Sequence, residues 1–437
     1  MVAWLMACAA DDAEIPTWNQ DVQPIVARSC AGCHQEGALA ARIPLDSYAD
    51  AQGWASVMAA AVEARRMPPF SARETPGCTP EFPWTNDRRL SDDEIATIAA
   101  WADGDAPEGD PADPAPITVP PALSDVSATF HPGPFTVPAR GALQDQYVCR
   151  IVDPALATDV YVEGMEVLPD RPEVVHHVLV FTDPAAASLA FVAPGSDTRL
   201  GDDAYACSGG TGVDGALLGG WVPGGSPLET PAGTAFQVGA GSLIVLQMHY
   251  HLAETAVDDA TGVAFRATAA APDRIAYAQL LGNAGSADEG LVLGPADGAA
   301  PEFRIPAGAV GHTETMDTVV EEPGSYQVFA VANHMHFAGA GMKVTVDGPD
   351  GERCLLETPD WDFDWQQLYT YDAESGRAPI VHQGDVVRNV CTYDNSFGNA
   401  ALSEIYAQQD RAEPVDIRIG EGDLDEMCLA FVAVVPL

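Results

Sequence analysis

The stretch "VVHHVLVF" (Val174–Phe181) is a run of β-branched and aromatic residues whose length is typical of a strand. From about residue 122 onward, similar short runs alternate with Gly, Pro and Asp. They include "DVYVEGMEV", "SLIVLQMHY", "YQVFAVAN", "MKVTVDG" and "VDIRI". This spacing predicts β-sandwich or jelly-roll architecture. Because more than 300 residues is large for one sandwich, we expect two such domains, at 122–272 and 273–437.

The sequence before this region has a different pattern of apolar residues, and residues 14–102 predict a small all-α domain. "TWNQDVQPIVARSCAGCH" has helical spacing of its apolar residues, and "SDDEIATIAAW" opens with a capping box of Ser91 and Glu94. Residues 103–121 are rich in Pro, Asp and Ala and predict a semi-stiff linker. The expected fold class is therefore multidomain, with a small all-α domain followed by two all-β domains.

The first helical stretch ends in C-x-x-C-H, the attachment signature of a c-type haem. Cys30 and Cys33 would form the thioethers, and His34 would be the proximal axial ligand. Met67, in "RRMPPF", is the predicted distal ligand, because a Met/His pair gives a low-spin electron-transfer haem. Met58 is the competing methionine, for which core packing is preferred. A zinc half-site is the alternative interpretation, but the surrounding helices and Met67 favour a cytochrome c-like haem domain.

Six of the ten histidines occur in three pairs within the β-rich region. The pairs are His176 and His177, His249 and His251, and His334 and His336. Residues two apart on a strand point to the same face, so each H-x-H pair could chelate one metal ion. Adjacent His176 and His177 could reach one ion only if the strand twists or bulges there. Burying so many imidazoles without a purpose would cost stability, which favours metal ligands over structural histidines.

Four motifs, in the order "VVHHVLVF", "LQMHYH", "NHMHFAG" and "DEMC", resemble the copper type II, ascorbate-dependent monooxygenases. That family includes peptidylglycine α-hydroxylating monooxygenase and dopamine β-monooxygenase. The resemblance covers roughly residues 140–437. It implies two jelly-roll domains, each holding one copper ion, on either side of a solvent-filled cleft.

The resemblance also implies which residues hold the two copper ions. The electron-transfer copper would be bound by His176, His177 and His249. The catalytic copper, where O2 binds and a C–H bond is hydroxylated, would be bound by His334, His336 and Met427. A thioether ligand agrees with this division, because it stabilises Cu(I). The family uses only the first histidine of "HYH", so His251 is interpreted as a structural neighbour of the first copper.

Three positions depart from the peptide-amidating members of that family. Those enzymes carry an arginine two residues before the first histidine of H-x-H, where this chain has Ala332. Polar residues that follow their Met-Cys pair are replaced by Leu429 and Phe431. The expected substrate is therefore a small, less polar organic molecule rather than a peptide with a C-terminal glycine.

Haem attachment uses two of the nine cysteines, and the resemblance implies a disulfide between Cys391 and Cys428. The even remainder predicts further disulfides in an exported protein, with the pairing open among Cys78, Cys149, Cys207 and Cys354. Periplasmic or cell-envelope location is expected, since haem is attached to such thiols outside the cytoplasm. "LMAC", ending at Cys8, resembles the end of a lipoprotein signal. Residues 1–13 are therefore interpreted as a signal or lipoprotein remnant, with Cys8 as a candidate lipid anchor.

The formal net charge of −44 is extreme, and Lys343 is the single lysine. Nucleic acid is an unsuitable partner, because phosphate binding needs clustered Lys and Arg. A solvated acidic surface is the simpler interpretation of the charge, and steering of a basic electron-transfer partner is the alternative.

Together these features predict an exported copper monooxygenase with two copper ions and one covalently bound haem c. The haem would pass electrons to the first copper, and ascorbate or a redox protein would be the external donor. Joining the haem to the copper region in one chain would raise the effective concentration of the donor. Two alternatives stay open: a non-catalytic copper-binding or electron-transfer protein on the same scaffold, and a zinc or structural β-sandwich with an accessory cytochrome.

Overall fold

The computed structural model describes residues 14–119, 121–141, 145–208, 210–283, 290–294 and 296–437. The predicted remnant at 1–13, with Cys8, lies outside the described residues. The chain divides into two compact units. The N-terminal unit comprises Met1–Phe70 and Arg88–Pro120, and the β-rich unit comprises Ser71–Asp87 and Pro121–Leu437. None of the helices in the described ranges combines the length and apolar character needed to cross a membrane.

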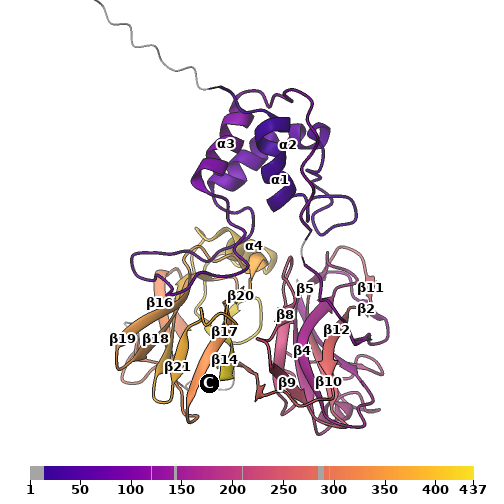
Figure 1. Ribbon diagram of the computed structural model, residues 1–437. Coiled ribbons are helices and arrows are strands. Elements are labelled where there is room, and N and C mark those ends of the chain that lie inside the picture. The colour runs from indigo at the N-terminus through magenta and orange to yellow at the C-terminus, as the bar shows by residue number, and fades with distance from the viewer. Residues whose placement is uncertain (1–13, 120, 142–144, 209, 284–289, 295) are drawn as a thin grey trace, which may run out of the picture. The chain divides into compact units, whose positions relative to one another are not determined.

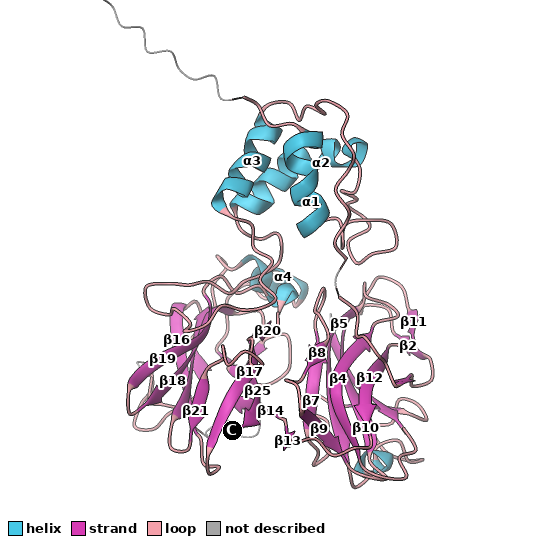
Figure 2. Cartoon of the chain, viewed as in Figure 1, coloured by secondary structure: helices cyan, strands magenta, loops and turns pink. Residues whose placement is uncertain are grey.

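The described part of the N-terminal unit contains three α-helices, drawn in cyan in Figure 2: α1 (Gln23–Ser29), α2 (Tyr48–Glu63) and α3 (Asp92–Asp103). A π-helical turn, η1 (Trp18–Val22), precedes α1. The predicted capping box is confirmed, because Ser91 and Glu94 each accept the other's backbone N–H through their side chains. Trp18 packs on Trp101 with ring centroids 5.7 Å apart, and Met58 is buried in the same core. The core-packing interpretation of Met58 is therefore confirmed.

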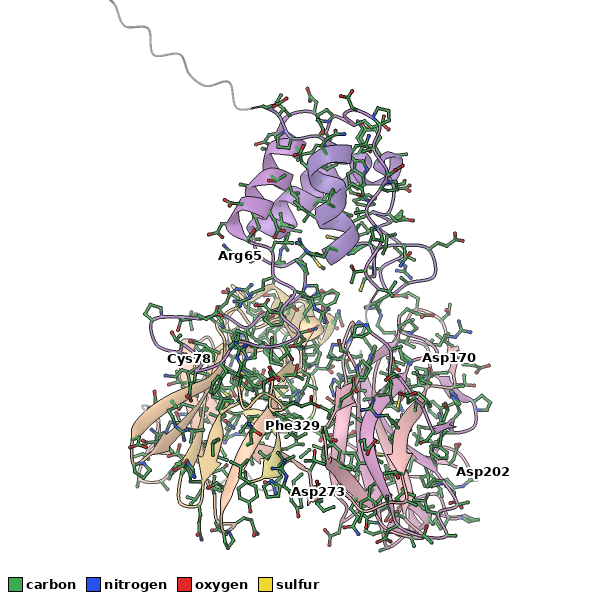
Figure 3. The ribbon with its side chains drawn as sticks, viewed as in Figure 1. Arg65, Cys78, Asp170, Asp202, Asp273 and Phe329 are labelled. Carbon is green, nitrogen blue, oxygen red and sulfur yellow. A yellow bond between two sulfur atoms is a disulfide. The ribbon has the colours of Figure 1, made fainter. Side chains whose placement is uncertain are left out.

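Residues 71–87, which we call the tethered segment, leave the N-terminal unit and belong to the β-rich unit. Cys78 of this segment, labelled in Figure 3, forms a disulfide with Cys354 of β19 (Gly351–Thr358). The Ala72 N–H donates a hydrogen bond of 3.2 Å to the Tyr369 hydroxyl group. The disulfide and this contact fix the segment to the β-rich unit at separate points.

The fold class expected from the sequence is wrong, because residues 14–102 do not form a distinct all-α cytochrome domain. The tethered segment interrupts that range, and α-helices cover fewer than half of the N-terminal unit's described residues. The described chain is mostly β-sheet with four short α-helices, the fourth being α4 (Ala400–Gln408). Helical periodicity is confined to short stretches, whereas the long-range disulfide of Cys78 determines where the intervening residues pack.

The largest of the described sheets has ten strands, several of which are labelled in Figure 1. Its order is β20 (Tyr369–Thr370), β17 (Ser325–His334), β25 (Leu429–Pro436), β14 (Tyr277–Gly282), β7 (Leu217–Trp221), β5 (Val175–Asp183), β10 (Leu243–His251), β3 (Asp145–Val152) and β6 (Ala204–Ala206), with β21 (Ile380–His382) paired to β17. β14 pairs with β25 on one side and, through Ala278 and Leu217, with β7 on the other. One continuous sheet therefore carries all three histidine pairs or their immediate neighbours.

Smaller sheets complete the unit. A six-stranded sheet contains β1 (Ala128–Phe130), β12 (Gly262–Thr268), β4 (Val160–Leu168), β9 (Thr234–Val238) and β13 (Arg274–Ile275), with β8 (Leu228–Glu229) paired to β4. A four-stranded sheet has the order β16 (Val310–Val319), β22 (Val386–Asp394), β18 (Gly339–Gly348) and β19. A three-stranded sheet contains β15 (Arg304–Ile305), β23 (Ile417–Ile419) and β24 (Asp425–Glu426), and β2 (Phe135–Val137) pairs with β11 (Val257–Asp259).

The six- and four-stranded sheets pack against the ten-stranded sheet, since β4 contacts β7, β16 contacts β14, and β19 contacts β17. The predicted β-sandwich-like architecture is therefore confirmed. Every residue of β10 except His251 is buried. Burial on both faces explains why "LIVL" (Leu243–Leu246) is a continuous apolar run rather than an alternating one.

Candidate metal centre

His176 and His177 are adjacent, yet both join one cluster because β5 is irregular at this point. In the register between β10 and β5, His249 lies opposite His177, and the next residue, Tyr250, lies opposite Val175. His176 is thus an extra residue of the β-bulge kind, which re-aims a side chain. The bulge that the two adjacent histidines required is therefore present.

The three imidazoles of His176, His177 and His249 converge through their Nδ1 atoms. The Nδ1 atom of His177 lies 3.2 Å from that of His176 and 3.3 Å from that of His249. Two imidazole nitrogens that bind one tetrahedral ion at about 2.0–2.1 Å lie about 3.3–3.4 Å apart. All three side chains are buried, and their ligand atoms lie within 4.8 Å of one another. This histidine triad therefore has the spacing of a metal site.

Two members of the triad, His177 and His249, are held in the neutral form that a metal requires. Burial lowers the pKa of His249 to about 4 and that of His177 well below its ordinary value. Neutral imidazole is the ligand form. The Nε2–H of His249 donates to Asp145 Oδ1 at 3.1 Å, which leaves the Nδ1 lone pair directed at the cluster.

His251 does not join the triad. It lies opposite Asp145 in the register of β10 and β3, and its Nδ1–H donates to Asp145 Oδ1 at 3.1 Å. Burial acts to raise the pKa of Asp145, but the hydrogen bonds from His249 and His251 hold it well below its ordinary value. Asp145 is therefore an ionised acceptor shared by the two histidines.

The third histidine pair, His334 and His336, lies at the C-terminal end of β17. The rings of His334 and His336 have centroids 5.3 Å apart. The Nδ1–H of His334 donates to Gln366 Oε1 at 2.8 Å, and the Nδ1–H of His336 donates to the Asp425 carbonyl at 3.1 Å. Burial lowers the pKa of His336 to about 3 and also lowers that of His334. The Nε2 atom of His336 is buried without a hydrogen-bond partner, as a metal ligand would be in the absence of its ion.

Met427 follows β24 and lines the same cavity as His334 and His177. The buried Glu426 carboxylate accepts the N–H groups of His336 at 2.8 Å and of Met427 at 3.1 Å. Burial raises the pKa of Glu426 to about 8, and these backbone N–H groups act in the opposite direction. One carboxylate thus fixes His336 relative to Met427.

The two ligand sets meet in one cluster. The ring of His177 lies 5.7 Å from that of His334, between centroids. Phe363, in the short 3₁₀ helix η3 (Phe363–Trp365), stacks on His176 at 4.6 Å and lies 6.1 Å from His336. The resemblance implied a solvent-filled cleft between the two sets; here their rings are close.

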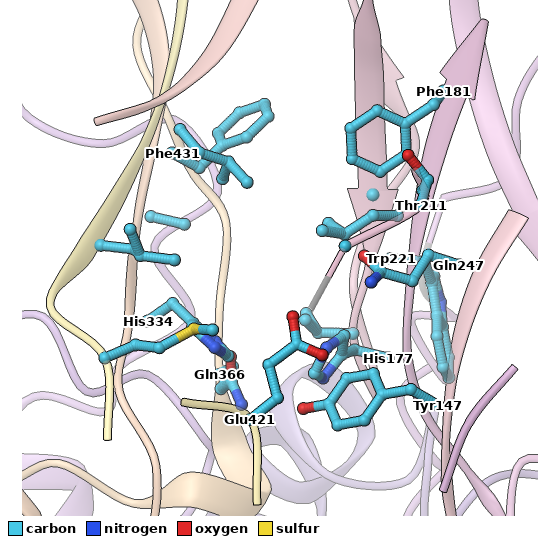
Figure 4. Close-up of a pocket in the computed structure, with 18 of the residues that line it drawn as sticks. Tyr147, His177, Phe181, Thr211, Trp221, Gln247, His334, Gln366, Glu421 and Phe431 are labelled. Carbon is cyan, nitrogen blue, oxygen red and sulfur yellow. The ribbon is translucent and has the colours of Figure 1, made fainter. Parts of the chain in front are cut away.

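A cavity of about 400 Å3 opens beside this cluster (Figure 4). His177, His334, Gln366 and Glu421 lie toward one end of it, and Phe181 and Phe431 lie toward the other. Ala332 and Leu429, two of the departures noted in the sequence, also line it. The cavity is therefore polar beside the histidines and apolar away from them.

The four predicted haem ligands all belong to the N-terminal unit. Cys30 and Cys33 are not in disulfides, and the His34 N–H donates to the Cys30 carbonyl. The Nδ1–H of His34 donates to the Ile43 carbonyl at 2.8 Å, which leaves Nε2 as the atom available to iron. Met67, half-buried, follows α2 in the same unit. The donor set therefore fits a covalently attached haem.

The described chain has three disulfides: Cys78–Cys354, Cys149–Cys207 and Cys391–Cys428. The third is the one that the resemblance implied, and it holds the residue after Met427 to β22. The other two give the pairing that the sequence left open. Disulfides are compatible with an exported protein.

Sequence reasoning missed several residues that hold the ligands in place. Asp145, Gln366 and Glu426 orient or fix histidines, and Phe363 stacks on His176. Tyr147 stacks on His249 with ring centroids 4.4 Å apart. Only the position of Asp145 opposite His251 gives a signal, and that requires knowing the strand register.

The sequence matches no protein-family model and no curated protein. Among solved structures, the chain is similar to the major capsid protein P2 from Bacteriophage PM2 at 9% identity and a TM-score of 0.29. That match covers 71% of this chain and 97% of the capsid protein. A likeness of this size carries no argument about function.

Proposed function

We propose that the protein is a copper monooxygenase that hydroxylates a C–H bond of a small organic substrate. The reaction would convert R–H, O2, two electrons and two protons into R–OH and water. The observation that carries the proposal is the convergence of the Nδ1 atoms of His176, His177 and His249 beside His334. Bound copper would supply the one-electron redox chemistry and O2 activation that side chains alone do not provide.

The residues divide into two donor sets. His176, His177 and His249 would hold one copper through three imidazoles, a set that suits both Cu(I) and Cu(II). His334, His336 and Met427 would hold the other, where a thioether favours Cu(I). This soft ligand supports copper over zinc. The unpartnered Nε2 of His336 supports a metal ion of either kind at this position.

Neighbouring groups prepare these donors. Asp145 and Gln366 each accept a ring N–H, from His249 and His334, and so keep the opposite nitrogen free for a metal. Phe363 covers the His176 ring and keeps water from that side. Such buried partners restrict ring rotation, so the donors are preorganised.

Electrons would enter through a haem attached to Cys30 and Cys33, with His34 and Met67 as axial ligands. An external donor, ascorbate or a redox protein, would reduce the haem. Because haem attachment of this kind occurs outside the cytoplasm, we place the protein in the periplasm or cell envelope, with Cys8 as a candidate lipid anchor.

The proposal is tested by supplying 18O2 and a reductant to protein matured with haem and copper, with a panel of small organic substrates. One 18O atom per product molecule and loss of turnover in His336→Ala are expected. His382→Ala, a change in a surface histidine outside the cluster, is the matched control and should retain turnover. Stoichiometric copper without any labelled product from the panel would favour an electron-transfer protein instead.

A further inference from the structure

We propose that the cavity beside the histidine cluster accepts an uncharged molecule with a mainly hydrocarbon body, about the size of a substituted benzene ring. This inference rests on the proposed function, because it names the substrate class of the same site. The cavity volume of about 400 Å3 falls within the range of small-molecule sites, about 300–1,000 Å3.

The apolar walls of the cavity come from strands that are distant in the chain. Leu179 and Phe181 of β5 and Trp221 of β7 line it from one side. Leu429 and Phe431 of β25 line it from the other, and both are buried. Aromatic and aliphatic walls on opposing sides suit a flat apolar body, since each contact removes apolar area from water.

Charge disfavours anionic substrates. Of the described residues that line the cavity, none is Arg or Lys, so a carboxylate or phosphate has no cationic side chain to pair with at the aromatic end. Placing an unpaired anion in such a site costs far more than placing a neutral group there. The net charge of −44 adds long-range repulsion.

Glu421 is the one carboxylate among the described lining residues, and it lies at the histidine end, near Tyr147 and His177 (Figure 4). An ammonium group drawn to Glu421 would sit among the metal ligands, away from Phe181 and Phe431. The aromatic end therefore binds the body of the substrate, and Glu421, which already has a partner within the chain, is not an open counter-ion for a cation.

Ala332 is the position that leaves the cavity without a cationic side chain. It lies opposite Phe431 in the register of β17 and β25 and lines the cavity. An arginine side chain from this position would reach the cavity and supply the cation that an anionic substrate needs. Ala332 is thus a specificity-determining residue that is not itself a metal ligand.

The test uses three probes with one carbon skeleton: propylbenzene, 3-phenylpropanoate and 3-phenylpropylamine. Their binding to the metal-free, full-length chain is measured by ligand-observed NMR. Propylbenzene should bind about tenfold or more tightly than either charged probe. Equal or tighter binding of the carboxylate or the amine would overturn the proposal.

The Ala332→Arg variant should lose propylbenzene binding and gain 3-phenylpropanoate binding. Val310→Arg, at a position that is 71% exposed on β16, is the matched control and should keep the original ranking. If Ala332→Arg fails to fold, the order of the three probe affinities in the unaltered chain still tests the proposal. Propylbenzene binding without hydroxylation would reject the proposed function alone, whereas copper-dependent O2 consumption without propylbenzene binding would reject this inference alone.

Discussion

The ring of His177 lies 5.7 Å from the ring of His334, although three other strands separate β5 from β17 in the sheet. Four interstrand steps of about 4.8 Å would place them about 19 Å apart in a flat sheet. The sheet must therefore curve to bring the two ligand sets together.

This proximity predicts magnetic coupling between two bound Cu(II) ions. The EPR signal of the fully loaded protein should be broadened relative to the sum of two isolated Cu(II) sites. Removing the second site with His336→Ala should restore a narrow signal from the triad. Two independent, unbroadened signals in the loaded protein would contradict the closeness of the sites.

Asp145→Asn should weaken copper binding at the triad by about 10–100-fold, because the His249 ring loses the carboxylate that keeps its Nδ1 atom free. Competition with a chelator of known affinity measures the effect. Asp350→Asn, in the exposed turn between β18 and β19, is the control. Equal affinity in the two variants would show that Asp145 does not orient the ligand.

Met67→Ala and Met58→Ala should separate axial ligation from packing. Met67→Ala should convert the haem from low spin to a high-spin or water-ligated form, seen in the absorption spectrum, with copper binding unchanged. Met58→Ala should leave the ligation intact but destabilise the protein by about 2–5 kcal/mol, since Met58 is buried in the N-terminal core. A change in haem spin state in Met58→Ala, with unchanged ligation in Met67→Ala, would show that Met58 is the axial ligand instead.

Replacing Cys78 and Cys354 together by serine should lower the free energy of unfolding by about 2–4 kcal/mol, because the disulfide closes a very long loop. Denaturant unfolding measures the change. Thr79→Ser, in the exposed part of the tethered segment, is the control. Copper binding should persist, since the ligands lie outside the segment; its loss would show that the segment also shapes the metal centre.

Local patterns in the sequence were enough to predict the strands, the capping box and the convergence of the histidines. The bulge at His176 could be anticipated because two adjacent histidines cannot otherwise face one ion. The pairing of Cys78 with Cys354 could not, because it depends on where the tethered segment packs, and this is the reason that the all-α domain was wrongly expected. Asp145 and Gln366 were also missed, since hydrogen bonds between distant strands leave no spacing signal.

Iron and copper per chain, measured on exported protein with matured haem, test the central claim most directly. The account predicts one iron and two coppers, with one copper lost in His176→Ala and the other lost or weakened in Met427→Ile. Zinc in place of copper, or a copper content unchanged by His176→Ala, would contradict it.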